Sequence, residues 1–238
     1  MKAPSNSLYL SAVSLALLWT VPFAKAEETE AKSSNIHLMF EFIEVSLADF
    51  SDWLTDHRLN SDATELRSTV QKWSKEDKAL VFETVVIQAR SGQRAKAESI
   101  AEVIYPTEYD PSEIPNKLSN IHNLVESPTT ALSSTAYETR NVGVTVEVDP
   151  VVNSGGKTIS LNMAPEIVRR LENLTWPNDG VDPKFQAEMP QFYTAKITTQ
   201  VEAKAGVPTL VGTIRLPEPV KQQRDNPVVL VFARADLD

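Results

Sequence analysis

The chain has 238 residues with no cysteine, 15 prolines, 7 glycines, and 23 basic against 32 acidic side chains. An apolar share of 42% is enough for a globular core, and it excludes collagen-like and wholly disordered chains. The absence of cysteine excludes disulfides, thiolate catalysis, cysteine-ligated zinc, iron–sulfur clusters and a lipoprotein anchor. The acidic balance makes nucleic acid an unfavourable partner, because the phosphate backbone would be repelled.

Residues 1–26 have the pattern of a secretory signal peptide. Lys2 precedes a mostly apolar run from Leu8 to Val21, and Ala24-Lys25-Ala26 supplies small residues at a cleavage position. The run has about 14 residues, fewer than the roughly 20 that span a bilayer as a helix. We therefore expect cleavage after Ala26 and export to the periplasm or outer membrane of a Gram-negative-type bacterium.

The placement of proline divides the remaining chain. Residues 27–105 contain no proline, whereas four prolines fall within 106–128. This pattern predicts an α+β half over 27–105, an irregular polar connection over 106–138 and an antiparallel β half over 139–238. A connection of that length is typically functional or mobile. The predicted fold class is a β-rich α+β fold in which two short N-terminal helices pack on long antiparallel strands.

The first half begins with a strand and two helices. Ile36–Val45 is apolar with few breaks and predicts a buried strand. Ser46 followed by Asp49 fits a capping box, so the first helix is expected to start there. A second helix is expected near Asp62. Two further strands are expected, separated by a turn at residues 91–93: Leu80–Arg90 and Arg94–Tyr105.

The second half alternates apolar and polar residues, which is typical of strands with one wet face. In Val142–Asp149 the valines at even positions face one way, and Gly155-Gly156 marks a hairpin turn after that strand. The last run is apolar on both faces and is expected to be a central, covered strand. The later strands are expected at Thr158–Met163, Gln191–Ala203, Thr209–Leu216 and Val228–Ala235.

The inventory of reactive residues predicts no enzyme, no metal and no cofactor. No HExxH, Walker, GxGxxG or GxSxG motif occurs. The three histidines are far apart: His37 is expected in the core, His57 in the last turn of a helix, and His122 in the polar connection. Glu147 and Asp149 share one strand face, and we interpret that acid pair as solvated surface.

Six segments occur in the order found in the secretin domain, the ring-forming C-terminal domain of type II and type III secretion and type IV pilus outer-membrane channels. The segments are Glu83–Ser99, Thr139–Pro150, Lys157–Glu166, Phe192–Val201, Gly206–Ile214 and Val228–Asp236. The resemblance covers roughly residues 80–238. Ser91–Asp110 is most similar to the short secretin-like proteins of the Verrucomicrobia.

Several small residues carry the family pattern. They are Gly92, Gln93, Ala95, Gly143, Gly206 and Gly212. Gly92-Gln93 would permit a tight turn between two long strands. Gly143 lies inside a valine-lined strand, which suggests a bend or a close approach of two backbones. These glycines would equally suit the hairpins of an ordinary soluble β domain.

The resemblance implies a passive, gated conduit for protein or pilus, assembled from identical copies through strand edges and without covalent chemistry. Other secretion-system envelope proteins are implied as further partners. The candidate polar lumen face is Thr194, Lys196, Thr198, Gln200 and Glu202. One alternative is a soluble periplasmic secretin-like module that binds a partner by edge pairing without forming a pore. Another is an enzyme or small-ligand binder on a β scaffold.

Two departures from the family pattern leave membrane association open. Secretins usually follow the Gly206–Ile214 region with an apolar run that belongs to the lipid-facing rim, whereas residues 216–225 here are short and polar. Thr213 also stands where the family commonly has a second glycine. The predicted strand faces are rich in valine and alanine and poor in the aromatic residues that edge a lipid-facing band.

Overall fold

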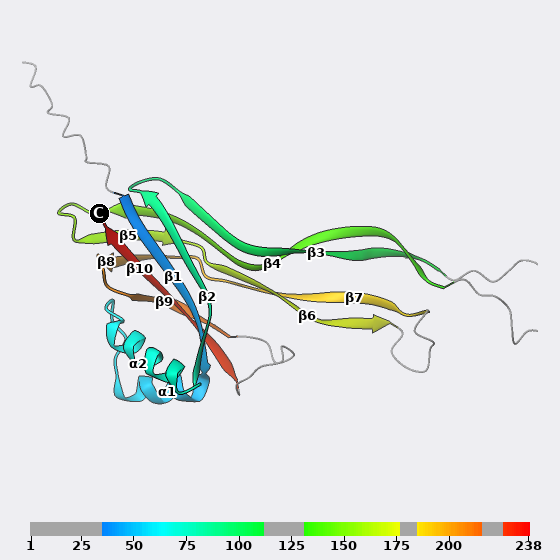
Figure 1. Cartoon of the computed structure of the whole chain (residues 1–238), viewed down its shortest axis with the longest axis horizontal. Coiled ribbons are helices and arrows are strands. Elements are labelled where there is room, and N and C mark those ends of the chain that lie inside the picture. The colour runs from blue at the N-terminus through cyan, green and yellow to red at the C-terminus, as the bar shows by residue number, and fades with distance from the viewer. Residues whose placement is uncertain (1–34, 112–130, 177–184, 216–225) are drawn as a thin grey trace, which may run out of the picture. The chain divides into compact units, whose positions relative to one another are not determined.

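The computed structural model describes residues 35–111, 131–176, 185–215 and 226–238. The expected signal peptide with its cleavage after Ala26, and His122, lie outside the described residues. The elements in chain order are β1 (Asn35–Ser46), α1 (Leu47–Asp56), α2 (Thr64–Lys75), β2 (Ala79–Arg90), β3 (Ala95–Asp110), β4 (Ser133–Val152), β5 (Thr158–Met163), β6 (Glu166–Trp176), β7 (Ala187–Lys196), β8 (Thr199–Lys204), β9 (Thr209–Arg215) and β10 (Pro227–Leu237) (Figure 1). The predicted β-rich α+β fold class is confirmed.

The first sheet has four antiparallel strands in the order β2-β1-β10-β9. β10 lies between β1 and β9, and its residues are buried on both faces, so the prediction of a central, covered strand is confirmed. Ile36 of β1 pairs with Leu237, and Val45 pairs with Val228. The last strand of the chain therefore completes the sheet of the first. Strands from the two halves predicted by proline placement therefore share one sheet.

The second sheet has four antiparallel rows, which we call lanes. A lane is either one long strand or two shorter strands that lie end to end. β5 and β6 lie end to end along β4, because both pair with it in one unbroken register. β7 and β8 continue in the same way along β6 and β5: Glu166 pairs with Lys196, and Met163 pairs with Thr199. The lane order is β3, β4, β5–β6 and β7–β8, so β3 and β7–β8 form its two edges.

Two predicted boundaries differ from the structure. The single strand expected over Gln191–Ala203 is divided between β7 and β8, because Pro165 on the neighbouring lane has no amide hydrogen to donate at that point. Residues 106–110 and 133–138 of the irregular connection expected over 106–138 lie in strands, since β3 runs to Asp110 and β4 begins at Ser133. Pro106 is tolerated inside β3 because β3 is an edge strand.

The hydrophobic core lies between the two sheets. Its buried residues come from alternate positions of each strand, as the period of two predicts. From the first sheet they include Ile36, Leu38, Phe40, Phe42, Val229 and Val231, and from the second Val144, Val146, Val148, Ile159, Leu161 and Met163. The opposite face of the first sheet packs on the helices through Ile43, Val45, Phe50, Trp53, Leu66 and Val70. The first sheet is thus covered on both faces where β1 carries Ile43 and Val45.

A short polar side chain accepts an amide hydrogen bond near the start of each helix. Ser46 caps α1 as predicted. Its hydroxyl oxygen accepts from the amide of Ala48 (3.2 Å), whereas a capping box would use the amide of Asp49. α2 begins at Thr64, two residues after the expected position, with Ala63 as its N-cap; the carboxylate of Asp62 accepts from the amide of Thr64 (3.0 Å). The expected pair of N-terminal helices is confirmed.

An ion pair fastens α2 to the first sheet. The guanidinium of Arg67 on α2 donates to both carboxylate oxygens of Glu41 on β1, each at 2.7 Å. Glu41 is buried, and its hydrogen bond to Arg67 raises the pKa of the arginine. Bidentate pairing of this kind fixes the orientation of the helix as well as its position.

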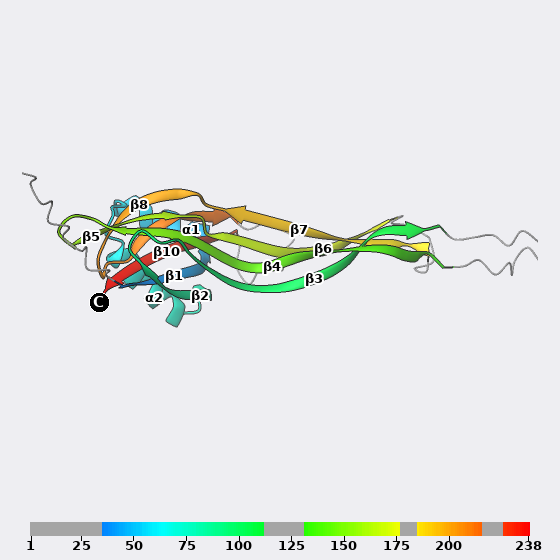
Figure 2. The ribbon, with the colours of Figure 1, turned by 90° about the horizontal axis from the view of Figure 1, so that it is seen from above.

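The second sheet continues beyond the core as an arm. The arm starts at the row of residues that pair across the sheet, Ile100, Gly143, Val168 and Thr194. It comprises residues 100–110 of β3, 133–143 of β4, 168–176 of β6 and 187–194 of β7. No side chain in these ranges is buried. Figure 2 shows the β3–β4 and β6–β7 hairpins running alongside one another away from β1 and β10.

Candidate functional site

The polar face predicted for the second sheet is exposed and continuous. Thr194, Lys196, Thr198, Gln200 and Glu202 share one face of the β7–β8 lane and are all exposed. The alternate positions of the same lane include Ala195 and Ala203, which are buried in the core. The predicted alternation is therefore confirmed, while the assignment of this face to a lumen stays a prediction.

Charged residues of the neighbouring lanes extend this polar face. Arg94 contacts Asp149 (2.9 Å) and Glu147 (2.7 Å), and Lys196 lies 3.6 Å from Glu166 on the adjacent lane. The hydrogen bond from Arg94 lowers the pKa of Asp149, and the same bond raises the pKa of Arg94. The acid pair interpreted as solvated surface is thus held by one arginine.

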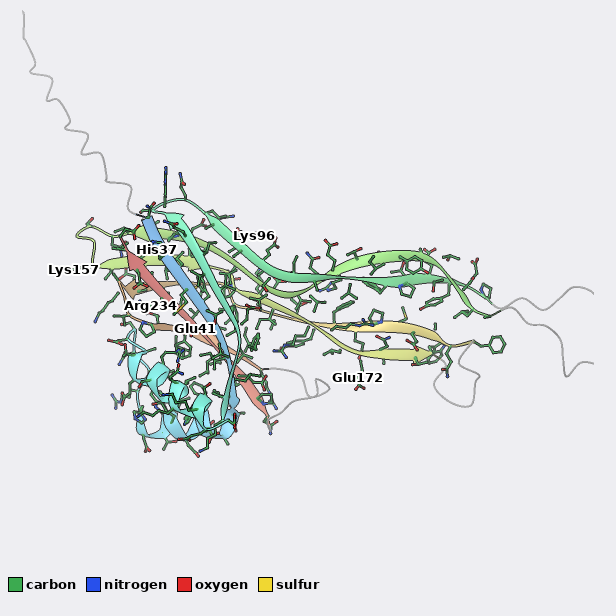
Figure 3. All side chains as sticks on the ribbon, viewed as in Figure 1. His37, Glu41, Lys96, Lys157, Glu172 and Arg234 are labelled. Carbon is green, nitrogen blue, oxygen red and sulfur yellow. The ribbon has the colours of Figure 1, made fainter. Side chains whose placement is uncertain are left out.

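A shallow groove of about 460 Å³ opens on the same face. Its charged and polar lining includes Lys96, Glu98, Thr145, Glu147, Glu166 and Lys196. Lys96, labelled in Figure 3, projects from β3, and its ammonium lies 2.8 Å from the carboxylate of Glu98. Both signs of charge are interspersed, which suits a wet surface better than a pocket for one small ion. Within the described ranges, no three acidic or histidine side chains gather closely enough to hold a metal ion.

The turn between β2 and β3 is built as the family pattern predicts. Gly92 has a left-handed φ of 77°, and its amide donates to the carbonyl of Pro150 (2.8 Å). The amide of Gln93 closes the turn on the carbonyl of Arg90 (3.0 Å). Ala95 then begins β3 and packs against the core. This turn fixes the start of the edge strand against the β4–β5 hairpin.

Gly143 marks a close approach of two backbones, as predicted. Its φ is 139°, and a Cβ at this position would collide with the carbonyl oxygen of Ser99 on β3. Gly206 lies in the β8–β9 turn, where its amide donates to the carbonyl of Ala235 (2.8 Å). Gly212 lies within β9, where a Cβ would be 3.0 Å from Cδ1 of Ile197. Their part in assembly stays a prediction.

The edges of the second sheet are the part of the site that could bind another chain. Among the described residues, neither β3 nor the β7–β8 lane pairs with a strand on its outer side. Edge strands present rows of backbone donors and acceptors that can pair with another chain. The two edges also run in opposite directions, because they are the first and the last of four antiparallel lanes.

The described histidines lie apart from this sheet face. His37 was expected in the core, which is wrong: its side chain is 45% exposed, and Nε2 lies 2.9 Å from Oδ1 of Asp238. Even-numbered residues of β1 face the second sheet, so His37 points the other way. His57 was expected in the last turn of a helix; it is the residue that follows α1, and its Nδ1 lies 2.9 Å from the carbonyl oxygen of Trp53.

Sequence reasoning missed the contacts that join distant segments. Arg94 and Asp149 are 55 positions apart, and Tyr105 meets Phe192 across the arm. No spacing rule brings such pairs together, because they depend on the register between strands. The charged residues were visible in the sequence, but their partners were not. Both helices of the described ranges are too short and too polar to cross a membrane.

Comparison with known proteins gives matches among solved structures alone. No protein-family model matches, and no curated protein matches. The InvG secretin of the Salmonella SPI-1 type III secretion injectisome matches at 12% identity and a TM-score of 0.42, over 87% of this chain and 65% of that one. The type II secretin GspD from enteropathogenic Escherichia coli matches at 11% identity and a TM-score of 0.44, over 89% and 71%.

A pilus protein is also among the matches. The PilQ secretin of the Vibrio cholerae type IV competence pilus matches at 11% identity and a TM-score of 0.43, over 89% of this chain and 63% of that one. The chain spans less than two thirds of the length of InvG and of PilQ. All three are described as secretins.

Proposed function

We propose that this protein is a secretin-like envelope component of a protein-secretion or pilus channel, exported to the periplasm or outer membrane. It acts by homo-oligomeric assembly through strand edges, without covalent chemistry. The observation that carries the proposal is the second sheet, whose two edge lanes, β3 and β7–β8, have no outer partner among the described residues. Two different edges on opposite sides of one sheet suit head-to-tail repetition of the chain.

The direction of the lanes supports a closed ring. In a ring, copies related by rotation about the ring axis hold their strands at the same angle to that axis. Because β3 and β7–β8 are opposite edges of the sheet, β3 of one copy would meet β7–β8 of the next. Because β3 runs outward along the arm and β7–β8 runs back, that junction is antiparallel like the other junctions of the sheet. Closure of the ring would also leave no edge exposed, which protects the assembly from aggregation.

The chemistry of the two faces supports a water-filled conduit. One face of the second sheet is covered by the first sheet, while the other carries the predicted lumen residues and the ion pairs of Arg94 and Lys196. Such a face can border water without exposing a large apolar patch. The conduit would pass folded protein or a pilus passively, and other secretion-system envelope proteins would dock on the ring.

The proposal is tested by the state of the purified native protein. The expected result is a heat-resistant band of high mass that fractionates with the outer membrane, with rings visible in negative-stain images. A monodisperse monomer in the periplasmic extract would overturn the channel.

A matched pair of variants locates the junction. Ile197 donates its amide inward to the carbonyl of Pro165 (3.0 Å), so the amide of its neighbour Thr198 faces the outer edge. Thr198→Pro removes that donor and is expected to abolish the high-mass band while the monomer stays folded by circular dichroism. Thr198→Val keeps the amide and is expected to assemble. Equal assembly of both variants would exclude this edge.

A second candidate is a soluble periplasmic module that binds a partner by strand addition to the same edge. The polar sequence at residues 216–225, where the family pattern expects an apolar rim, favours it. This candidate predicts a monomer whose partner capture is lost in Thr198→Pro and retained in Thr198→Val.

A further inference from the structure

The two edges of the second sheet meet each other in the arm. β3 and β7 are separated by two lanes in the sheet, yet the ring of Tyr105 on β3 lies 5.3 Å from the ring of Phe192 on β7. Farther out, the hydroxyl of Tyr109 donates to the backbone carbonyl of Glu188 on β7 (2.6 Å). Figure 2 shows the two hairpins side by side along this length. The sheet therefore curls until its edge strands touch.

Arg140 adds a third contact between the same hairpins. Its guanidinium donates to Oγ1 of Thr194 (2.9 Å) and lies 5.4 Å from the centre of the Phe192 ring. Phe192 is thus flanked by an aromatic ring from β3 and a cation from β4. Such aromatic and cation–π contacts prefer defined geometries, so they select one arrangement of the hairpins.

Tyr105 is held in place on its own hairpin. Its hydroxyl donates to the carboxylate of Glu138 on β4 (3.1 Å), and burial together with this carboxylate raises the pKa of the tyrosine. The tyrosine stays protonated at neutral pH and keeps donating to Glu138. Its ring is therefore fixed where it faces Phe192.

We propose that Tyr105, Tyr109, Arg140 and Phe192 form a latch that closes the arm of a single copy and withholds its edges from a neighbouring copy. The inference rests on the proposed assembly through β3 and β7–β8. The hydroxyl of Tyr109 donates to the backbone carbonyl of Glu188 on β7, and an incoming strand would use backbone carbonyls of this edge. None of the four latch side chains is buried: three are half-buried and Arg140 is exposed, so a neighbouring copy can displace the latch without opening the core.

A latch of this kind solves a physical problem of export. A single copy with two long open edges pairs non-specifically with other chains. Contact between the edges of one molecule competes with such pairing, because the tethered groups have a high effective concentration. Assembly then starts only where several copies meet in the correct orientation.

The absence of cysteine allows a direct test by cross-linking. In the full chain, Tyr105→Cys with Phe192→Cys is joined by a short bis-maleimide, which holds the two hairpins together. The expected result is a monomer, whereas the same protein without cross-linker forms the heat-resistant high-mass band. The matched control is Ala101→Cys with Val142→Cys, which are paired within the β3–β4 hairpin and leave the arm able to open. Assembly of the cross-linked 105–192 protein at the control rate would overturn the latch.

A second test releases the latch instead of locking it. Tyr109→Phe removes only the hydroxyl donor, and Phe192→Leu removes the ring that Tyr105 and Arg140 contact. Each variant is expected to assemble several-fold faster than the native chain, measured as the growth of the high-mass band with time. Unchanged or slower assembly of both would overturn the latch.

The outcomes separate the two proposals. If the native chain assembles and the cross-linked chain assembles equally well, the latch is wrong and the proposed function stands. If neither the native chain nor the release variants assemble under any condition, the proposed function fails, and the latch fails with it.

Discussion

The four lanes of the second sheet run through both the sandwich of two sheets and the arm, and the two regions differ in what covers these lanes. In the sandwich, Val146 and Ile159 are fully buried under the first sheet. In the arm, Ile104 is 70% exposed and Trp176 is 73% exposed. The strands do not change at the boundary, but the first sheet ends there. Burial rather than strand formation therefore separates the sandwich from the arm.

The same difference decides what each region can do. Two-stranded hairpins without a covered face are marginally stable in water, so the arm depends on its attachment to the sandwich and on contacts between its hairpins. The sandwich fixes the position of the arm, and the arm carries exposed strand edges. Four predictions follow this division, beginning with the largest effect.

The largest loss of stability is expected from a core substitution. Phe40 is fully buried between the sheets, so Phe40→Ala should lower the free energy of unfolding by about 3–5 kcal/mol. Ile104→Ala in the arm should change it by less than about 0.5 kcal/mol, because the side chain is already mostly in water. Urea unfolding followed by circular dichroism measures both. Equal losses would contradict the assignment of stability to the sandwich.

The ion pair beneath α2 comes next. Arg67→Met leaves the carboxylate of Glu41 buried without its bidentate partner, and is expected to cost about 2–4 kcal/mol in urea unfolding. The double variant Glu41→Met with Arg67→Met should recover much of that loss. By contrast, Lys96→Met breaks the exposed pair with Glu98 on the second sheet and should change stability little. A large effect of Lys96→Met would show that the outer face is energetically coupled to the core.

A pair of glycines tests where the arm joins the sandwich. Gly143 and Gly155 both have positive φ, but only Gly143 has backbone atoms of a neighbouring strand where a Cβ would lie. Gly155→Ala should cost about 1 kcal/mol from the dihedral alone. Gly143→Ala should cost more, at least about 2 kcal/mol, because β3 and β4 must separate. Thermal unfolding compares the two, and equal shifts in Tm would argue against the close approach.

The smallest expected effect is a dependence on pH at the outer face. Arg94 lowers the pKa of Asp149 below its ordinary value of 3.8, so the folded state favours the ionised carboxylate. That stabilisation is present above the ordinary value and is lost as the pH falls through the lowered one. Arg94→Gln should return the pKa of Asp149 toward its ordinary value in a carboxyl NMR titration. The pKa of Asp62, lowered mainly by hydrogen bonds with Thr64, should stay unchanged in the same sample and serves as the control.

Local patterns were sufficient for the individual strands and turns. The even-numbered valines of β4, the left-handed turn at Gly92 and the covered strand β10 follow from periodicity, from turn chemistry and from an apolar run. His37 shows the limit of such patterns. It lies among apolar residues, and only the pairing of β1 decides that its side chain faces solvent.

Part of the candidate site could likewise be predicted from local patterns, and part could not. The alternation that exposes Thr194, Lys196, Thr198, Gln200 and Glu202 was visible in the sequence, because it depends on the period of one strand. The division of the expected strand into β7 and β8 opposite Pro165 was not visible, since it depends on the neighbouring lane. The edges that the proposed function uses could be recognised only after every lane had its partners.

The sequence by itself determined which segments are extended, which residues of each strand face inward and where the chain turns, because these depend on the properties of neighbouring residues. The tertiary structure decided that β10 completes the sheet of β1, that Arg94 reaches Asp149 and that Tyr105 faces Phe192. Such contacts join residues far apart in the chain. They are set by the register that buries the most apolar surface, which is a property of the whole fold.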